Sequence, residues 1–171
     1  MDNKYNLYVT LNDNGTKYHY YLRFDQSEKH LVIYHLIDLL GDDEKRNLPK
    51  LKEIFKAEPN NTVSLTSAAL IKFVDGFGGI TFNGRKIDGK QALAEVKNDN
   101  FAEVLSALGV EISGRKNLMF TMPGIFKSIK DGFETDLNMM KTAKIMLDEA
   151  PKLKNWKIEL IKVNKDNVSS I

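Results

Sequence analysis

YNLYVTLNDNGTKYHYYLRF, residues 5–24, is the part of this sequence that most directly predicts a fold. Apolar and more polar residues alternate on both sides of a central polar break, and this period of two is typical of a β-strand with one buried face. Asn14-Gly15 lies in the break, and both residue types tolerate a positive φ. The stretch therefore predicts a β-hairpin whose buried face is formed by Tyr5, Leu7, Val9, Leu11, Tyr18, Tyr20, Leu22 and Phe24.

The opposite face of this hairpin is a candidate binding surface. It carries Tyr8, His19, Tyr21 and Arg23, a set that would suit a protein partner or stacked bases if it were exposed. A layer of helices over the same face would make these residues part of the core instead. The sequence leaves both alternatives open, and an exposed face would also suit a homodimer interface.

The chain after the hairpin reads as a helix. Asp25 and Glu28 have the spacing of a helix N-terminal box, an apolar run extends from Leu31 to Leu40, and Gly41 follows as a C-cap. Because the run is apolar almost all round, it is either a buried helix or a strand.

The remaining chain predicts short strands and helices in alternation. Helices are expected from Pro49 to about 57, over 67–73, from just after Asp88 through Val96, and over 101–108 and 136–150. Strands are expected over 62–65, 118–121 and 156–160, with a second hairpin at 80–87. The order lacks the regular strand and helix repetition of a doubly wound sheet. We therefore expect an α+β fold, with a mainly antiparallel sheet built from hairpins and several helices packed on one face. Residues 1–171 would form a single domain that ends in a short polar tail from about residue 164.

Composition excludes several kinds of site and of location. Hydrophobic residues make up 42% of the chain and charged residues 28%, as in ordinary globular proteins. The absence of cysteine excludes disulfides, thiolate metal sites and thiol nucleophiles. The N-terminus does not read as a secretory signal, and no apolar run approaches the roughly 20 residues that cross a bilayer. A cytoplasmic location without a membrane partner is expected.

The net charge of +2 is too small to indicate a polyanion partner. Residues 112–171 nevertheless hold 11 basic against 7 acidic residues. Within them, a basic patch would form if the last strand lay beside the strand expected after Gly114, and its members would be Arg115, Lys116, Lys154 and Lys157. Such a patch would suit nucleic acid, whereas lysines along an edge strand more often only keep that edge soluble.

No catalytic motif is present. The chain has no Gly-x-Ser-x-Gly elbow and only three histidines, and His30 and His35 would diverge on a helix. His35 and Asp38 would form a base and its orienting acid only if a nucleophile lay nearby. Gly76-Phe77-Gly78-Gly79 lacks the Gly-Lys-Ser/Thr ending of a phosphate-binding loop and reads as a turn. No metal and no cofactor are expected.

Methionines gather in the last third of the chain, at positions 119, 122, 139, 140 and 146. Methionine surfaces adapt to several partners, but methionine more often fills gaps in a core, and we expect the core role here.

These observations favour a small, non-enzymatic binding or regulatory protein that acts on another protein through its surface, as an accessory, phage-encoded or immunity-type factor does. Two alternatives remain open. One is an enzyme whose carboxylate, tyrosine or lysine groups converge only in the fold, and the other is a weakly basic nucleic-acid-binding protein.

Overall fold

The computed structural model describes residues 4–171, except for the side chains of residues 139, 140, 143, 146 and 147. Eight strands are described: β1 (Lys4–Asp13), β2 (Thr16–Asp25), β3 (His30–Leu36), β4 (Asn61–Thr66), β5 (Ile80–Phe82), β6 (Arg85–Ile87), β7 (Phe133–Thr135) and β8 (Lys157–Val163). The described α-helices are α1 (Glu44–Phe55), α2 (Ser67–Gly76), α3 (Gly89–Lys97), α4 (Phe101–Ser113), α5 (Leu118–Ile129) and α6 (Met139–Glu149). Short 3-10 helices are η1 (Lys130–Gly132), η2 (Ala150–Asn155) and η3 (Val168–Ser170).

The main sheet has six strands in the order β7-β4-β1-β2-β3-β8. The pairs β1 with β2, β2 with β3 and β4 with β7 are antiparallel, whereas β1 with β4 and β3 with β8 are parallel. The α+β class is confirmed, but the sheet is mixed, and the expectation of a mainly antiparallel sheet built from hairpins is wrong. The two parallel pairs join segments that are distant in sequence, and local turn signals do not report such pairings.

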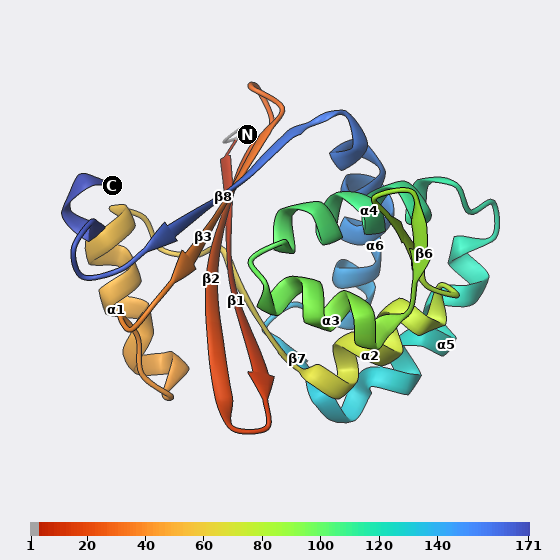
Figure 1. Cartoon of the computed structure of the whole chain (residues 1–171), viewed down its shortest axis with the longest axis horizontal. Coiled ribbons are helices and arrows are strands. Elements are labelled where there is room, and N and C mark those ends of the chain that lie inside the picture. The colour runs from red at the N-terminus through yellow and green to blue at the C-terminus, as the bar shows by residue number, and fades with distance from the viewer. Residues whose placement is uncertain (1–3) are drawn as a thin grey trace.

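Helices cover both faces of this sheet, as Figure 1 shows, with α1 on one side and α2 to α6 on the other. The larger core lies on the side of α2 to α6, where Val9, Leu11, Tyr20, Leu22 and Ile33 pack with residues of α2, α3, α4, β5 and β6. A second core lies under α1. Several helices do pack on one face of the sheet, as expected, but α1 also covers the other face.

The first hairpin is confirmed. β1 and β2 pair from Lys4 with Asp25 down to Asp13 with Thr16, and Asn14 and Gly15 turn with φ of 52° and 92°. Its predicted apolar face does point into the larger core, since Leu7, Tyr18 and Phe24 also pack there. The alternation thus fixes both the pairing register and the buried face.

The apolar run predicted as a helix over 31–40 is instead strand β3. Leu31 and Ile33 face the larger core while Tyr34 and Leu36 lie in or against the core under α1. A strand buried on both faces loses the alternation of polar and apolar residues, which is why the run resembles a buried helix. The predicted N-terminal box is an Asx turn, in which the Asp25 carboxylate accepts hydrogen bonds from the N–H groups of Ser27 and Glu28.

The strand predicted over 118–121 is also wrong, because these residues begin helix α5. Leu118, Met122, Ile125, Phe126 and Ile129 form the buried side of that helix. Their spacing of three and four residues is helical, and Pro123-Gly124 lies inside the helix.

The other elements agree closely with the sequence. The second hairpin, β4, the helices α2, α3, α4 and α6, and the last strand lie where they are expected, within a few residues at each end. Helix α1 begins at Glu44, before Pro49, because the Asp43 side chain accepts a hydrogen bond from the N–H of Lys45 and caps the helix there.

Candidate functional site

The predicted binding face of the first hairpin is covered by α1. Tyr8 and Tyr21 have no exposed surface, and His19 is buried. The Phe55 ring of α1 stacks on the Tyr21 ring with 4.0 Å between centroids, and burial raises the pKa of Tyr21 to about 12. Arg23 is half-buried and donates a hydrogen bond from Nη2 to the Phe55 carbonyl at 3.1 Å. The open platform is therefore not formed, and the covered-face alternative is the one that the structure takes.

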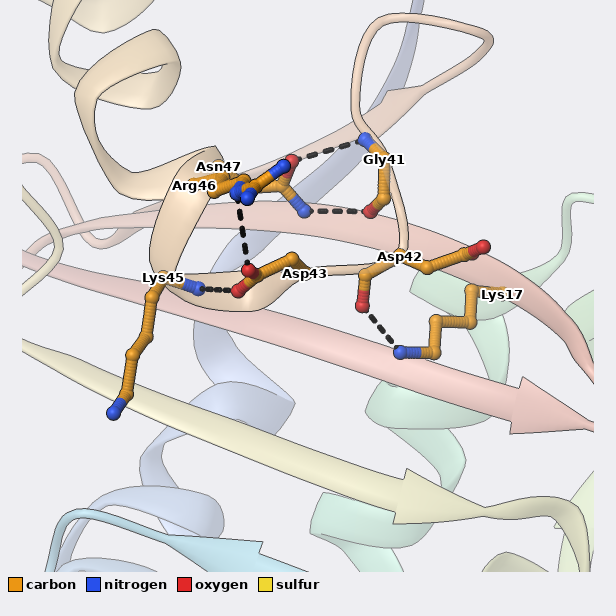
Figure 2. A network of polar contacts seen from close by, with 7 residues as sticks. All are labelled: Lys17, Gly41, Asp42, Asp43, Lys45, Arg46 and Asn47. Atoms are coloured by element: carbon orange, nitrogen blue, oxygen red, sulfur yellow. Dashed lines mark hydrogen bonds and ion pairs between the residues drawn. The ribbon is translucent and has the colours of Figure 1, made fainter.

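A polar network holds α1 in this position (Figure 2). The Asn47 side chain accepts a hydrogen bond from the Gly41 N–H at 2.9 Å and donates one to the Gly41 carbonyl at 2.8 Å. Lys17 of β2 donates to the Asp42 carbonyl at 2.6 Å, and Arg46 lies 3.4 Å from the Asp43 carboxylate. The loop before α1 is thus tied both to the helix and to the hairpin.

The same asparagine reaches the buried tyrosine. Asn47 Nδ2 donates to the Tyr8 hydroxyl at 3.1 Å, and that hydroxyl lies 2.8 Å from His19 Nδ1. Burial, helped by the nearby charge of Lys17, lowers the pKa of His19. In the neutral tautomer that carries its proton on Nε2, the imidazole accepts at Nδ1 and the Tyr8 hydroxyl is the donor. This cluster satisfies buried polar groups, and its geometry is that of a structural anchor.

The predicted basic patch is not assembled in the predicted way. The element directly after Gly114 is helix α5 and not a strand, and the neighbour of β8 is β3. Arg115 donates to the Phe77 carbonyl and lies 3.3 Å from Glu111, whereas Lys157 lies 3.2 Å from Glu159 on its own strand. Lys116 and Lys154 are exposed. The premise that placed Arg115 and Lys116 beside Lys154 and Lys157 is wrong.

His35 takes a different acid from the one predicted. Its Nδ1 lies 2.8 Å from Asp99 Oδ1, in the turn between α3 and α4, and Lys162 Nζ lies 2.5 Å from the other Asp99 oxygen. Burial alone would raise the pKa of Asp99, but the hydrogen bonds from Lys162 and His35 outweigh it and lower that pKa. The His35 ring stacks on Tyr20 with 4.8 Å between centroids. These groups tie β3 and β8 to the α3–α4 turn.

The larger of two surface hollows is a groove of about 440 Å³, which we call the Trp156 groove. Three parts of the fold contribute to it: the β5–β6 hairpin, helix α4, and the chain that enters β8. The residues that line it are Thr81, Phe82, Asn83, Ala102, Glu103, Ser106, Ala107, Val110, Trp156 and Ile158. The smaller hollow, of about 190 Å³, is lined by Arg85, Lys86, Ile87, Gln91, Ala94 and Glu95.

Each wall of the Trp156 groove follows from local sequence. Asn83 and Gly84 turn the β5–β6 hairpin with φ of 47° and 75°, which places Thr81 and Asn83 at the rim beside buried Phe82. On α4, groove-lining residues recur at the helical spacing of 103, 106, 107 and 110. Trp156 is the first residue after η2. Its ring packs edge-on against Phe24, with 6.4 Å between ring centroids.

The chemistry of the Trp156 groove is that of binding. Six of the ten lining residues are aromatic or aliphatic, but polar groups make up the larger part of the exposed lining, and the hydroxyl, amide and carboxylate groups of Thr81, Asn83, Ser106 and Glu103 supply hydrogen-bonding positions. Glu103 is the only ionisable side chain in that lining, so an acid and base pair does not occur there. Val110 is 52% exposed and therefore supplies accessible apolar surface to the groove.

Sequence reasoning did not find this groove. The residues come from segments about 75 positions apart, and each looks like ordinary core packing by itself. The available signal was the lone tryptophan placed directly before a strand, since tryptophan is enriched where proteins bind one another.

Among the described residues, no three His, Asp or Glu side chains lie close enough together to hold a metal ion. Within the same part of the chain, none of the helices has the length and apolar character needed to cross a lipid bilayer.

Comparison with known proteins finds solved structures of similar fold but no related sequence. No family model matches the sequence, and a comparison with curated proteins gives no match. Solved structures do match over nearly the whole chain. The Lin1025 protein from Listeria innocua has a TM-score of 0.77 at 9% identity, over 95% of this chain and 84% of that one.

Two other similar structures carry functional descriptions. A transcriptional regulator from Enterococcus faecalis has a TM-score of 0.71 at 15% identity, over 94% of this chain and 76% of its own. TagT bound to LI-WTA has a TM-score of 0.67 at 12% identity, over 95% of this chain and 78% of its own. At these identities the likeness shows the fold alone.

Proposed function

We propose that this chain is a non-enzymatic binding or regulatory protein, and that the Trp156 groove binds a short extended segment of another protein. The observation that carries the proposal is the combination of apolar side chains with several hydrogen-bonding groups in one open groove. Binding sites commonly join apolar contact area to polar groups that fix the orientation of the partner.

The character of the partner segment follows from the lining. Trp156, Phe82 and Val110 offer contact to an aliphatic or aromatic side chain, which would supply most of the affinity. Glu103 favours a lysine or arginine next to that anchor, because it is the only charge in the lining. We therefore expect a segment with one large apolar residue and a neighbouring basic residue.

A regulatory role is in keeping with the description of one protein of the same fold as a transcriptional regulator. The proposal does not depend on that description, because identity of 15% carries no residue of the site across.

The experiment is a selection of random peptides displayed on phage, followed by calorimetric titration of the peptides recovered. We expect enrichment of the apolar and basic pattern, and at least a tenfold rise in Kd for Val110→Lys, since a lysine would place a charge on the apolar wall. Met119→Lys makes the same kind of change at an exposed methionine outside the groove and should leave Kd unchanged.

Either of two results would reject the groove as the binding site. One is a selection without enrichment from folded protein. The other is a set of peptides that bind Val110→Lys as tightly as the unchanged chain.

A further inference from the structure

Helix α5 has an outer surface that its packing does not explain. Met119 is 75% exposed and Phe120 is 87% exposed, the two highest values among the large hydrophobic side chains that the structure describes. The buried side of the same helix already packs against Ala69, Phe77 and Ile112 in its own apolar cluster. The exposed pair therefore adds nothing to the core, and the expectation that Met119 fills the core is wrong. Met122 does fill it, and positions 139, 140 and 146 lie outside the described side chains.

The charge around this pair is segregated. Residues 114–130 contain four basic residues and no acidic one, which leaves 21 basic and 23 acidic residues in the rest of the chain. The whole positive excess of the protein thus lies in this one segment. A net charge of +2 conceals this distribution, and the count over residues 112–171 diluted it with the acidic residues that follow position 130.

Three of these four cations are available on the surface. Lys116, Lys127 and Lys130 are exposed and form no ion pair with any residue that the structure describes. Arg115 differs, because Glu111 and the Phe77 carbonyl already hold it. On the helix, Lys127 lies seven residues after Phe120, which places both side chains on the same side of α5.

We propose that this surface, defined by Lys116, Met119, Phe120, Lys127 and Lys130 and called the α5 face, docks on an anionic lipid surface. Exposed Phe and Met side chains enter the boundary between headgroups and acyl chains, while lysines pair with the anionic headgroups. This is a peripheral contact, and it requires no helix that crosses the bilayer.

Charge and shape together favour lipid over other anionic partners. A nucleic-acid duplex would satisfy the lysines but would leave the Phe120 and Met119 side chains in water, since its backbone offers no apolar surface to them. The two side chains are exposed and line neither of the two hollows described above. A soft apolar layer accepts such side chains without a preformed pocket, whereas a protein partner must provide one.

The test is co-sedimentation of the full chain with vesicles, either of phosphatidylcholine alone or of phosphatidylcholine and phosphatidylglycerol in equal parts. We expect binding to the mixed vesicles only. The double variant Met119→Ser with Phe120→Ser should bind at least tenfold more weakly. Ile161→Ser makes the same kind of change at an exposed apolar residue of β8, outside both proposed surfaces, and should bind as the unchanged chain does.

A second measurement separates insertion from attraction by charge alone. In the chain with Trp156→Phe and Phe120→Trp, the emission of the new tryptophan should shift to shorter wavelength when mixed vesicles are added. Circular dichroism of each variant establishes that it is folded before binding is compared.

Three results would overturn the proposal. They are the absence of binding to mixed vesicles, equal binding by the double serine variant, and binding to duplex DNA that the double serine variant retains. The last would assign the α5 face to nucleic acid. Because Val110 lies in the Trp156 groove and not on the α5 face, either site can fail while the other stands.

Discussion

Asn47 is the residue on which the cover over the first hairpin most depends. Its side chain is 1% exposed and makes hydrogen bonds to both backbone groups of Gly41 and to the Tyr8 hydroxyl. An asparagine between Arg46 and Leu48 carries no sequence signal of such a role, because its partners lie 6 and 39 positions away.

Replacement of this residue should be costly. We expect Asn47→Ala to lower the free energy of unfolding by roughly 1–3 kcal/mol, since buried polar groups of the loop would lose their partner. Asn98→Ala, at an exposed position, should change it little. Urea denaturation measures both, and equal midpoints for the two variants would show that the Asn47 contacts contribute nothing.

His19 should make stability depend on pH near neutrality. Burial, followed by the charge of Lys17, lowers the pKa of His19 in the folded protein, so the unfolded chain binds more protons as the pH falls. The contribution of neutral His19 to the free energy of unfolding is fully present above the unfolded pKa of about 6.5, and it is lost progressively as the pH falls below that value.

The comparison that isolates this residue is His19→Gln, which keeps a side chain able to accept from Tyr8 but does not titrate. Between about pH 7.5 and about pH 5.5, the urea midpoint of the unchanged chain should fall more than that of the variant. If the urea midpoints of the unchanged chain and of His19→Gln fell by the same amount, His19 would ionise equally well in the folded and unfolded states.

The close packing of α2 against α3 depends on a glycine at position 89, which has no Cβ. A Cβ at Gly89, the first residue of α3, would overlap the backbone of Ile71 in α2. The Gly89 N–H also donates to Asp75 of α2 at 2.7 Å, which holds the two helices at this distance.

We therefore expect Gly89→Ala to destabilise the protein by roughly 1–3 kcal/mol, through strain between two helices. Gly124→Ala, inside α5, is the matched control, because nothing lies within 4 Å of the added carbon and alanine favours a helix. Thermal unfolding should give a lower Tm for the first variant and an equal or higher Tm for the second. The reverse order would contradict the packing described here.

Elements with local signals could be predicted from the sequence, and those that depend on distant partners could not. Alternation and Asn14-Gly15 define the first hairpin, and Asn83-Gly84 defines the second. Strand β3 was mistaken for a helix because it pairs with β8, more than 120 positions later, and is buried on both faces. Its alternation of polar and apolar residues was thereby lost.

The same reasoning explains the candidate sites in the whole molecule. Alternation correctly identified the two faces of the hairpin, but only the packing of α1 determines that Tyr8, His19 and Tyr21 are covered. The Trp156 groove needs α4, the β5–β6 hairpin and the start of β8 together, so no single stretch of sequence predicts it. The α5 face was missed because residues 118–121 were taken as a strand and charge was counted over segments that were too long.

Two surfaces with different chemistry thus lie on one fold. The Trp156 groove is a hollow whose lining has a single acidic charge, whereas the α5 face is basic and carries outward apolar side chains. A protein with both would hold a partner segment while resting on an anionic lipid surface, and each contact would remain possible without the other.

The emission of Trp156, the only tryptophan in the chain, reports directly on the groove. On titration with a peptide recovered by selection, we predict a saturable shift to shorter wavelength in the unchanged chain, with a midpoint at least tenfold higher in Val110→Lys. Saturable binding by calorimetry without any change in Trp156 emission, and with the same Kd in Val110→Lys, would place the partner elsewhere and contradict the proposed function.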